Sequence, residues 1–169
     1  EEKNRLKLES INKLSKKLDF YKKEIEKYVD EKMYNQNTKT LKRNAEDEIT
    51  DISVLGTVVP FKMYKAKEKK ITNTIEKINM RLRTYTGGYL RFEGDHYREG
   101  NSPWAIATLW MAMYYKEIGE KKKAQECIDF IVNSSNKHGL LGEQIDNSTM
   151  QPNWVIGLAW SHAMFILGI

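Results

Sequence analysis

A glycine-rich segment in the second half of the chain holds the side chains best suited to chemistry. It runs from Gly87 to Trp104 and combines glycines with charged and aromatic residues, among them Arg91 and Asp95. Carboxylates and arginines can bind hydroxyl groups through hydrogen bonds, and aromatic rings can stack on the C–H faces of sugars. A structural alternative, in which Arg91 pairs with Asp95 to hold the loop, explains the same residues equally well.

A second candidate is the acidic residue in the segment Gly139-Leu-Leu-Gly-Glu-Gln144. Glu143 alone indicates little about catalysis, and Gln144 and Asp146 beside it make a polar cluster rather than a site.

The sequence contains no recognisable metal site and implies no cofactor. The three histidines lie in separate segments, at His96, His138 and His162, and a single cysteine, Cys127, excludes an internal disulfide framework. We expect His162 to be a hydrogen-bonded structural residue and Cys127 to pack as a small apolar one. The aromatic residues Trp110, Tyr114, Tyr115 and Trp160 are expected in the core.

Charge and hydropathy argue against nucleic acids and membranes as partners. The net charge of +5 is uneven, since residues 1–83 hold 21 lysines and arginines against 14 acidic residues, whereas residues 84–169 hold 7 against 9. The lysines alternate with glutamates, as on a solvated helix face. The longest apolar stretch, 154–169, is shorter than a bilayer span. The chain begins at Glu1 rather than at a methionine, so the sequence leaves its localisation unknown.

The spacing of apolar residues predicts six helices. Three are amphipathic, at 6–33, 69–82 and 121–133, and three are almost wholly apolar, at 52–64, 103–118 and 154–169. Pro60 is expected to kink or end its helix. The polar segments 34–51, 84–102 and 134–153 are predicted loops, the first with a small hairpin near Thr38. We expect the helix 6–33 to pack on a globular core rather than to form a coiled coil.

Helix type and loop length alternate together along the chain. Apolar helices are buried on every side and amphipathic ones face water, and each long loop follows an amphipathic helix. This pattern predicts an all-α fold of helical hairpins, with the apolar helices inside and every long loop on one face. Negligible strand is expected outside residues 35–45. Three such hairpins make half of a six-hairpin toroid or an open solenoid.

Four segments, taken in order, resemble the family-15 glycoside hydrolases, which are the prokaryotic glucoamylases, glucodextranases and related trehalases. They are GGYLRFEGDHYREGNSPW, LWMAMYYKEIGEKKKA, GLLGEQID and LAWSHAMF, and Asp51-Ile-Ser-Val-Leu-Gly56 adds a fifth similarity. The resemblance covers about residues 17–169. It implies that residues 1–169 are one partial domain, the C-terminal half of an (α/α)6 toroid comprising helices seven to twelve.

The resemblance also implies roles for four residues in the inverting, exo-acting hydrolysis of an α-glucoside or oligosaccharide. Glu143 matches the general base, Arg91 the sugar-binding arginine, Asp95 the acidic residue near it, and Trp104 a tryptophan that lines the pocket. The chain departs from the family where Ser102 is inserted before Pro103 and where Gly142 replaces the proline before the base.

An inverting hydrolase also needs a general acid. The family's acid would lie upstream of Glu1, and Glu46, Asp47 and Glu48 match no family acid. We therefore expect the chain to be inactive alone and to associate with an N-terminal half of the same enzyme or with itself. Two alternatives stay open: a non-catalytic carbohydrate-binding or regulatory half-barrel, and a helical-hairpin interaction scaffold.

Overall fold

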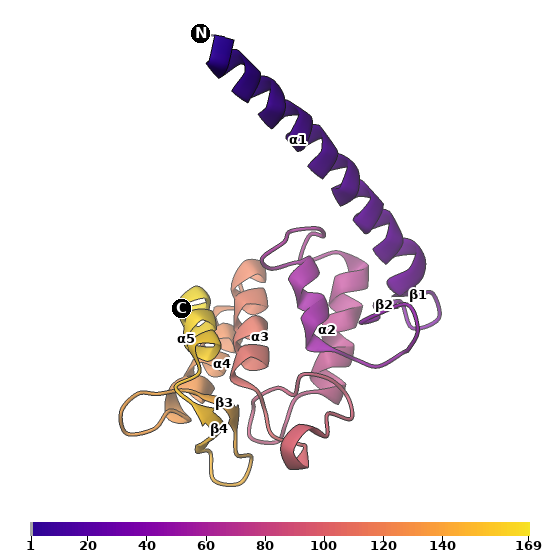
Figure 1. Cartoon of the computed structure of the whole chain (residues 1–169). Coiled ribbons are helices and arrows are strands. Elements are labelled where there is room, and N and C mark those ends of the chain that lie inside the picture. The colour runs from indigo at the N-terminus through magenta and orange to yellow at the C-terminus, as the bar shows by residue number, and fades with distance from the viewer. Residues whose placement is uncertain (1) are drawn as a thin grey trace.

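The protein is mostly helical in the computed structural model, which describes the backbone of residues 2–169 and the side chains of residues 7, 8, 10–98 and 100–169. The helices are α1 (Glu2–Tyr28), α2 (Lys69–Arg81), α3 (Ala105–Ile118), α4 (Lys121–Asn133) and α5 (Ala159–Gly168). A π-helical turn (Val29–Met33) extends α1, and 3-10 helices span Ile52–Thr57 and Tyr97–Glu99. Two antiparallel hairpins, β1 (Tyr34–Asn35) with β2 (Thr40–Leu41) and β3 (Gly142–Ile145) with β4 (Pro152–Ile156), complete the fold (Figure 1).

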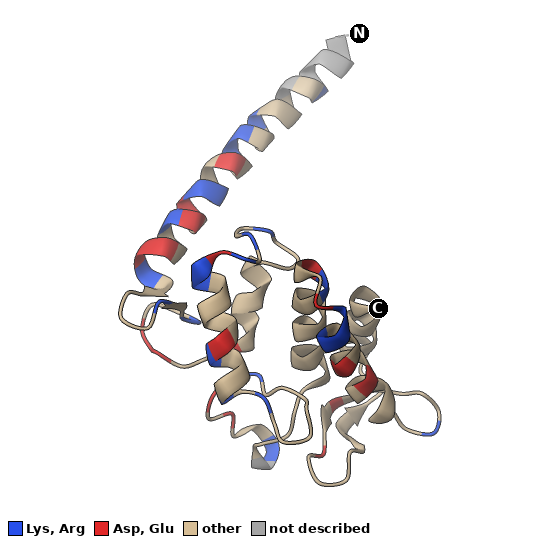
Figure 2. Ribbon diagram, turned by 180° about the vertical axis from the view of Figure 1, so that it is seen from behind, with Lys and Arg blue, Asp and Glu red and all other residues tan. Residues whose placement is uncertain are grey.

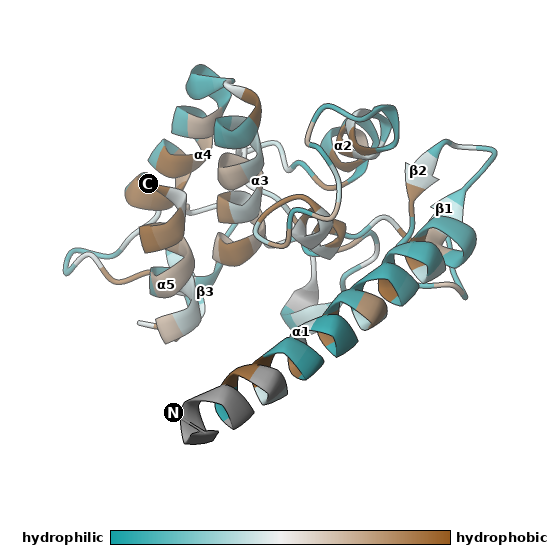
Figure 3. Ribbon diagram, turned by 90° about the horizontal axis from the view of Figure 1, so that it is seen from above, coloured by the Kyte–Doolittle hydropathy of each residue, from teal (hydrophilic) through white to brown (hydrophobic). Residues whose placement is uncertain are grey.

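Three predicted helices are confirmed nearly to the residue. The apolar face of α2 is buried along its length, and α3 is buried on almost every side, as an all-apolar helix should be. Gly119 ends α3 in the left-handed conformation, with φ 84°, which costs a glycine little. The amphipathic α4 then packs back against α3 (Figure 3).

The predicted helix over 52–64 is wrong in length. Asp51 caps a short 3-10 helix by accepting a hydrogen bond from the Ser53 N–H at 2.8 Å, but this helix ends at Thr57. Pro60 cannot donate a backbone hydrogen bond, so the following residues form turns instead. The segment is still largely buried, although Phe61 is exposed.

The predicted helix over 154–169 is also wrong at its start, and the expectation of negligible strand outside 35–45 is wrong with it. Residues 152–156 form β4, where Val155 and Ile156 are β-branched residues that favour strands. Gly157, with φ 80°, ends the strand, and α5 begins at Ala159. The small hairpin near Thr38 is confirmed as β1 and β2.

The long N-terminal helix does not pack on the core, which corrects the expectation from its amphipathic pattern. Figure 1 shows α1 projecting from the body. Its apolar stripe is 50–59% exposed at Leu8, Ile11, Leu14, Leu18, Tyr21, Ile25 and Tyr28. Lysines and glutamates alternate along its other faces (Figure 2).

The anchor of α1 is the π-helical turn at its end. Val29 is buried there, and the Asp30 carboxylate accepts hydrogen bonds from the Tyr64 hydroxyl at 2.8 Å and the Lys70 ammonium at 2.6 Å. Burial opposes ionisation of Asp30, but these two donors outweigh it and lower the pKa of the carboxyl.

The core lies between α2, α3 and α4 and continues beneath α5. Tyr114 and Tyr115 are buried there, as expected, and burial raises the pKa of the Cys127 thiol to about 12. The expectation for Trp160 is wrong, since its side chain on α5 is 56% exposed. None of the described helices combines the length and apolarity that a membrane crossing requires.

Candidate functional site

Backbone hydrogen bonds join the three predicted long loops on one face of the molecule. The Glu93 N–H donates to the Thr50 carbonyl at 2.9 Å, which links the loop 84–102 to the loop 34–51. The Ile145 N–H donates to the Pro103 carbonyl at 2.8 Å, and Trp104 forms an isolated antiparallel bridge with Gln144. Gln144, the residue after Glu143, is thus the bridge partner of Trp104. Glu143 itself lies on strand β3 rather than on the expected loop.

Arg91 and Asp95 form a nearly ideal bidentate pair. The Arg91 Nε lies 2.8 Å from one carboxylate oxygen of Asp95, and Nη2 lies 3.0 Å from the other. The Tyr97 N–H donates to the same carboxylate at 3.0 Å. Burial alone would raise the pKa of Asp95, but the donated hydrogen bonds outweigh it and leave this pKa below its usual value. Asp95 is therefore a carboxylate at neutral pH.

The Trp104 indole stacks on the face of the Arg91 guanidinium. The Arg91 Cζ lies 3.7 Å from the Trp104 ring centroid, and the Tyr97 ring packs 5.5 Å from the indole. Because Asp95 holds the edge of the guanidinium and the indole holds its face, Arg91 has little freedom to rotate. The structure thus brings together three of the four predicted site residues.

Where Trp104 pairs with Gln144, three buried polar atoms of Trp104, Glu143 and Gln144 have no well-aligned hydrogen-bond partner among the described residues. They are one carboxylate oxygen (Oε2) of Glu143, the amide Oε1 of Gln144, and the indole Nε1 of Trp104, which makes no well-aligned hydrogen bond but contributes to the lowered pKa of Asp95. An unsatisfied buried polar group costs about 1–3 kcal/mol, so native proteins seldom keep several together without a purpose. One donor and two acceptors suit hydroxyl groups, which both donate and accept.

The β3–β4 hairpin holds Glu143 at an irregularity. Gly142 pairs with Ile156 and Gln144 pairs with Asn153, so Glu143 lies opposite two residues, Trp154 and Val155. Such a bulge commonly re-aims a side chain next to a functional site.

Helix α5 secures the start of β3. The Ser161 hydroxyl donates to the Gly142 carbonyl at 2.8 Å, and the Leu141 N–H donates to Nε2 of His162 at 3.3 Å. Since Nε2 accepts, Nδ1 of His162 carries the proton and donates to the Leu158 carbonyl at 2.9 Å. The structural role expected for His162 is confirmed.

The substitution of Gly142 for proline has a steric reason. A Cβ atom at this position would lie 2.5 Å from the Gln144 carbonyl oxygen and 2.9 Å from the Asn153 nitrogen. Only glycine fits this approach of the two strands without displacing the backbone.

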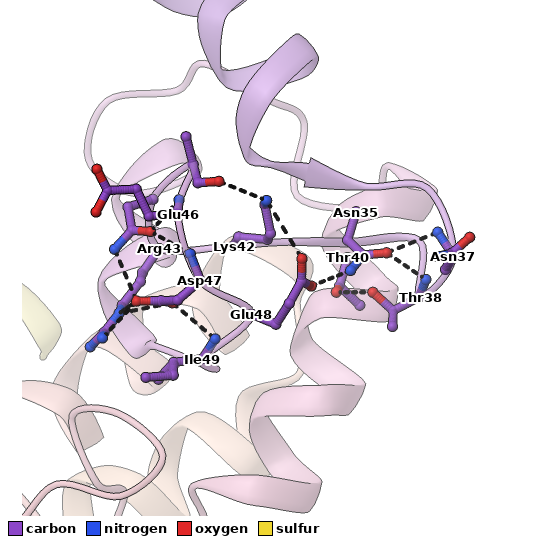
Figure 4. Close-up of polar contacts among 12 residues, drawn as sticks. Asn35, Asn37, Thr38, Thr40, Lys42, Arg43, Glu46, Asp47, Glu48 and Ile49 are labelled. Carbon is purple, nitrogen blue, oxygen red and sulfur yellow. Dashed lines mark hydrogen bonds and ion pairs between the residues drawn. The ribbon is translucent and has the colours of Figure 1, made fainter.

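Two acidic residues of the loop 34–51, Asp47 and Glu48, are held in ion pairs, as Figure 4 shows. Arg43 donates to Asp47 with Nε and Nη2, at 3.0 and 2.8 Å from Oδ2, and these hydrogen bonds lower the pKa of Asp47 to about 2. Glu48 accepts from Asn35 and lies 3.6 Å from Lys42. The lowered pKa of Asp47 keeps it ionised, which does not suit the protonated form that a general acid needs.

Three residues of this region, Tyr97, Arg98 and Trp154, were not singled out from the sequence, and Gln144 was noted only as part of a polar cluster. Tyr97 and Gln144 contact Trp104, while Arg98 and Trp154 form a second stack, with the Arg98 Cζ 4.5 Å from the Trp154 ring centroid. Arg98 and Trp154 both adopt positive φ, at 48° and 63°. Nothing in the sequence marks that conformation, since neither residue type favours it.

Known proteins similar to this chain are glycoside hydrolases, although no protein-family model matches it. It is 30% identical over 176 residues to a protein named an uncharacterized glycosyl hydrolase from Methanocaldococcus jannaschii, a match that covers 95% of this chain and 28% of that protein. It is 28% identical over 128 residues to trehalase 1 of Sulfolobus acidocaldarius, covering 75% of this chain and 22% of the trehalase.

Solved structures show the same fold. A glycosidase in complex with glucose superposes with a TM-score of 0.75 at 19% identity, covering 85% of this chain and 41% of that one. A bacterial glucoamylase complexed with acarbose gives a TM-score of 0.73 at 21% identity, covering 94% and 28%. The chain thus spans less than half the length of each of these proteins. By sequence and by fold, the chain is a relative of the glucoamylase-like glycoside hydrolases.

Proposed function

We propose that this chain forms one side of the active site of an inverting, exo-acting α-glucoside hydrolase, with Glu143 as the general base. The observation that supports this most is the rigid Arg91–Asp95–Trp104 cluster beside Glu143, with unsatisfied polar atoms on Trp104, Glu143 and Gln144. Arg91, whose side chain is 30% exposed, is the cation of this cluster that a ligand can reach, and the buried Asp95 and Trp104 hold it in place.

In the proposed reaction, Arg91 binds the terminal glucosyl unit. Two of its five N–H groups bind Asp95, which leaves the others to donate to sugar hydroxyls. Asp95 acts as a positioning residue, because it stays ionised and holds the guanidinium in place. The Glu143 carboxylate removes a proton from water as the oxygen attacks the anomeric carbon, which inverts its configuration.

The general acid, in this proposal, comes from a part of the enzyme outside these 169 residues. Of the carboxylates on this face, Asp95 is committed to Arg91 and Asp47 to Arg43. Inversion requires a second carboxyl roughly 6.5–9.5 Å from the base, with room for a water between them. The exposed stripe of α1 and the apolar hollow of ≈ 230 Å³ between Phe61, Trp110 and Trp160 are surfaces on which such a part, or a second copy of the chain, would pack.

The commitment of Asp95 and Asp47 to arginines also favours a second candidate, a carbohydrate-binding module that does not cleave. Both candidates predict sugar binding, and hydrolysis separates them.

Binding is tested by titrating the isotope-labelled chain with methyl α-glucoside and following amide shifts. We expect shifts around residues 91–104 and 142–145, and their loss in Arg91→Ala. The matched control is Arg43→Ala, which removes the other bidentate arginine of this face and should leave binding unchanged. Loss of binding in both variants, or in neither, would contradict the assignment of Arg91.

Hydrolysis is tested by adding the segment that carries the acid and measuring glucose release. We expect activity only in the mixture, and none after Glu143→Gln, with binding retained. Glu48→Gln should keep full activity. Sugar binding without glucose release in the mixture would favour the non-catalytic module, and full activity of Glu143→Gln would refute its role as base.

A further inference from the structure

Helix α1 carries an apolar stripe that the described residues leave open. The helix projects from the body and is anchored through the π-helical turn at its end, so the stripe faces solvent over most of its length (Figure 1). Its apolar residues follow one another at alternating spacings of three and four, which is the repeat of a coiled coil. The residues that keep this spacing, here called the α1 seam, are Ile11, Leu14, Leu18, Tyr21, Ile25 and Tyr28.

The α1 seam offers enough apolar surface for two helices to pair. Each of its side chains is about half exposed, so two copies packed against each other would bury on the order of 1,200 Å², which is the lower limit for specific interfaces. The seam is shorter than three heptads, and coiled coils of that length are weak. The surface therefore fits a reversible pair rather than a permanent one.

Charged residues beside the α1 seam distinguish the two directions in which copies could pair. With Leu18 at heptad position a, Lys17 and Glu24 occupy g positions and Lys22 an e position. In a parallel pair g faces e, so Lys17 would meet Lys22 of the second copy, twice by symmetry. In an antiparallel pair g faces g, so Lys17 would meet Glu24 of the second copy, also twice. Because like charges repel and opposite charges attract, the flanks favour the antiparallel pair.

The sizes of the seam side chains favour the same direction. With the helices antiparallel and Leu18 opposite Tyr21, every residue of the α1 seam has a partner in the second copy. The layers are Ile11 with Tyr28, Leu14 with Ile25, and Leu18 with Tyr21. A parallel pair would instead place two leucines in one layer and two tyrosines in the next. Large side chains opposite smaller ones interdigitate better than layers of unequal width.

We propose that α1 is a dimerisation helix, which pairs through the α1 seam with α1 of a second copy in antiparallel orientation. The two bodies then lie toward opposite ends of the helix pair, because each body follows the C-terminal end of its own α1 (Figure 2). The apolar hollow between Phe61, Trp110 and Trp160 takes no part in this contact. The inference does not depend on the proposed function, since it involves neither Arg91 nor Glu143.

Disulfide crosslinking of the full 169-residue chain tests the pairing and its direction. Chains with Leu14→Cys or Ile25→Cys are oxidised separately and as an equimolar mixture, while the native Cys127 is buried. Position 14 faces position 25 in the antiparallel pair, so we expect a crosslinked dimer in the mixture and none in either variant alone. In a parallel pair each variant would crosslink with itself, and that result would overturn the proposal.

Sedimentation velocity of charge variants tests the same contact without cysteines. Lys17→Glu places two glutamates against Glu24 of the second copy and should weaken the dimer about tenfold. Adding Glu24→Lys to that variant restores both attractive pairs and should restore the wild-type affinity. The matched control is Lys16→Glu, which makes the same change of charge away from the α1 seam and should dimerise as the wild type does.

The remaining outcomes are equally decisive. Tighter association of Lys17→Glu would indicate a parallel pair, in which the new glutamate meets Lys22, and would overturn the proposal. A wild-type chain that stays monomeric at its highest soluble concentration, or that covers the α1 seam only when the rest of the enzyme is added, would refute it as well. Sugar binding at Arg91 is measured separately, so either result leaves the proposed function standing.

Discussion

Replacing Arg91 by methionine should destabilise the protein at neutral pH and much less in acid. Methionine keeps an aliphatic stem against Trp104, so the change removes mainly the charge and its two hydrogen bonds. The Asp95 side chain is 4% exposed and would lose its partner, whereas Arg91 is 30% exposed. Breaking a fully buried pair costs about 3–5 kcal/mol, and partial solvent screening on the arginine side reduces this to about 2–3 kcal/mol.

The pH dependence follows from the direction of each pKa shift. In the wild type the pKa of Asp95 is lowered, so its contribution is present above the unfolded value of about 4 and is lost as the pH falls through the folded pKa. Without Arg91, burial dominates and raises the pKa of Asp95 above the unfolded value. The free energy of unfolding of Arg91→Met is therefore reduced at pH 7, and this reduction disappears when acid protonates the Asp95 carboxyl.

Urea unfolding followed by circular dichroism at pH 7 and pH 3 measures both effects. The control is Arg43→Met, which breaks the exposed pair with Asp47 and should have a small effect at either pH. An Arg91→Met variant no less stable than this control at pH 7, or one equally destabilised at both pH values, would refute the reasoning.

Three further predictions concern the hairpin, α1 and the cysteine. Gly142→Ala should destabilise the protein by about 1–3 kcal/mol in urea unfolding, because the added methyl group meets the backbone of both strands. The comparison is Gly139→Ala, whose methyl group meets no atom within 4 Å. Because Gly139 has φ 73°, that variant measures the cost of backbone strain without a steric clash. Leu18→Glu in the exposed stripe of α1 should lower self-association in sedimentation velocity without changing the melting temperature, whereas Lys16→Glu on the same helix should change neither. The Cys127 thiol, with its pKa raised to about 12, should react with a thiol reagent at pH 8 only at the rate of unfolding, and fast labelling of the folded protein would contradict its burial.

Much of the fold was predictable because burial imposes periodicity. The helices 69–82, 103–118 and 121–133 carry apolar residues on complete faces, and tertiary packing agrees with that local pattern. The segments 52–64 and 154–158 are apolar without a helical period, and such runs do not distinguish a helix from a buried turn or a strand. Pro60 and Gly157 mark the points where the chain leaves the predicted helices.

The candidate site, like the fold, could be predicted from the sequence only in part. The resemblance of four segments, taken in order, implied Arg91, Asp95, Trp104 and Glu143, and the spacing of Arg91 and Asp95 already allows them to pair. The stacking of Arg91 on Trp104 depends on how two segments of one loop fold back on each other, which no local pattern encodes. The same is true of Arg98 and Trp154, which meet across 56 positions of sequence.

The sequence by itself determined the helical class, the single face that carries the long loops, and the chemical character of the site, because these depend on local periodicity and on side-chain type. Only the tertiary structure decided that Glu143 lies on a strand opposite a bulge and that Gly142 must be glycine. It also decided that buried polar atoms of Trp104, Glu143 and Gln144 lack well-aligned hydrogen-bond partners among the described residues. Those features arise from contacts between segments distant in the chain, where packing and hydrogen bonding override local preference.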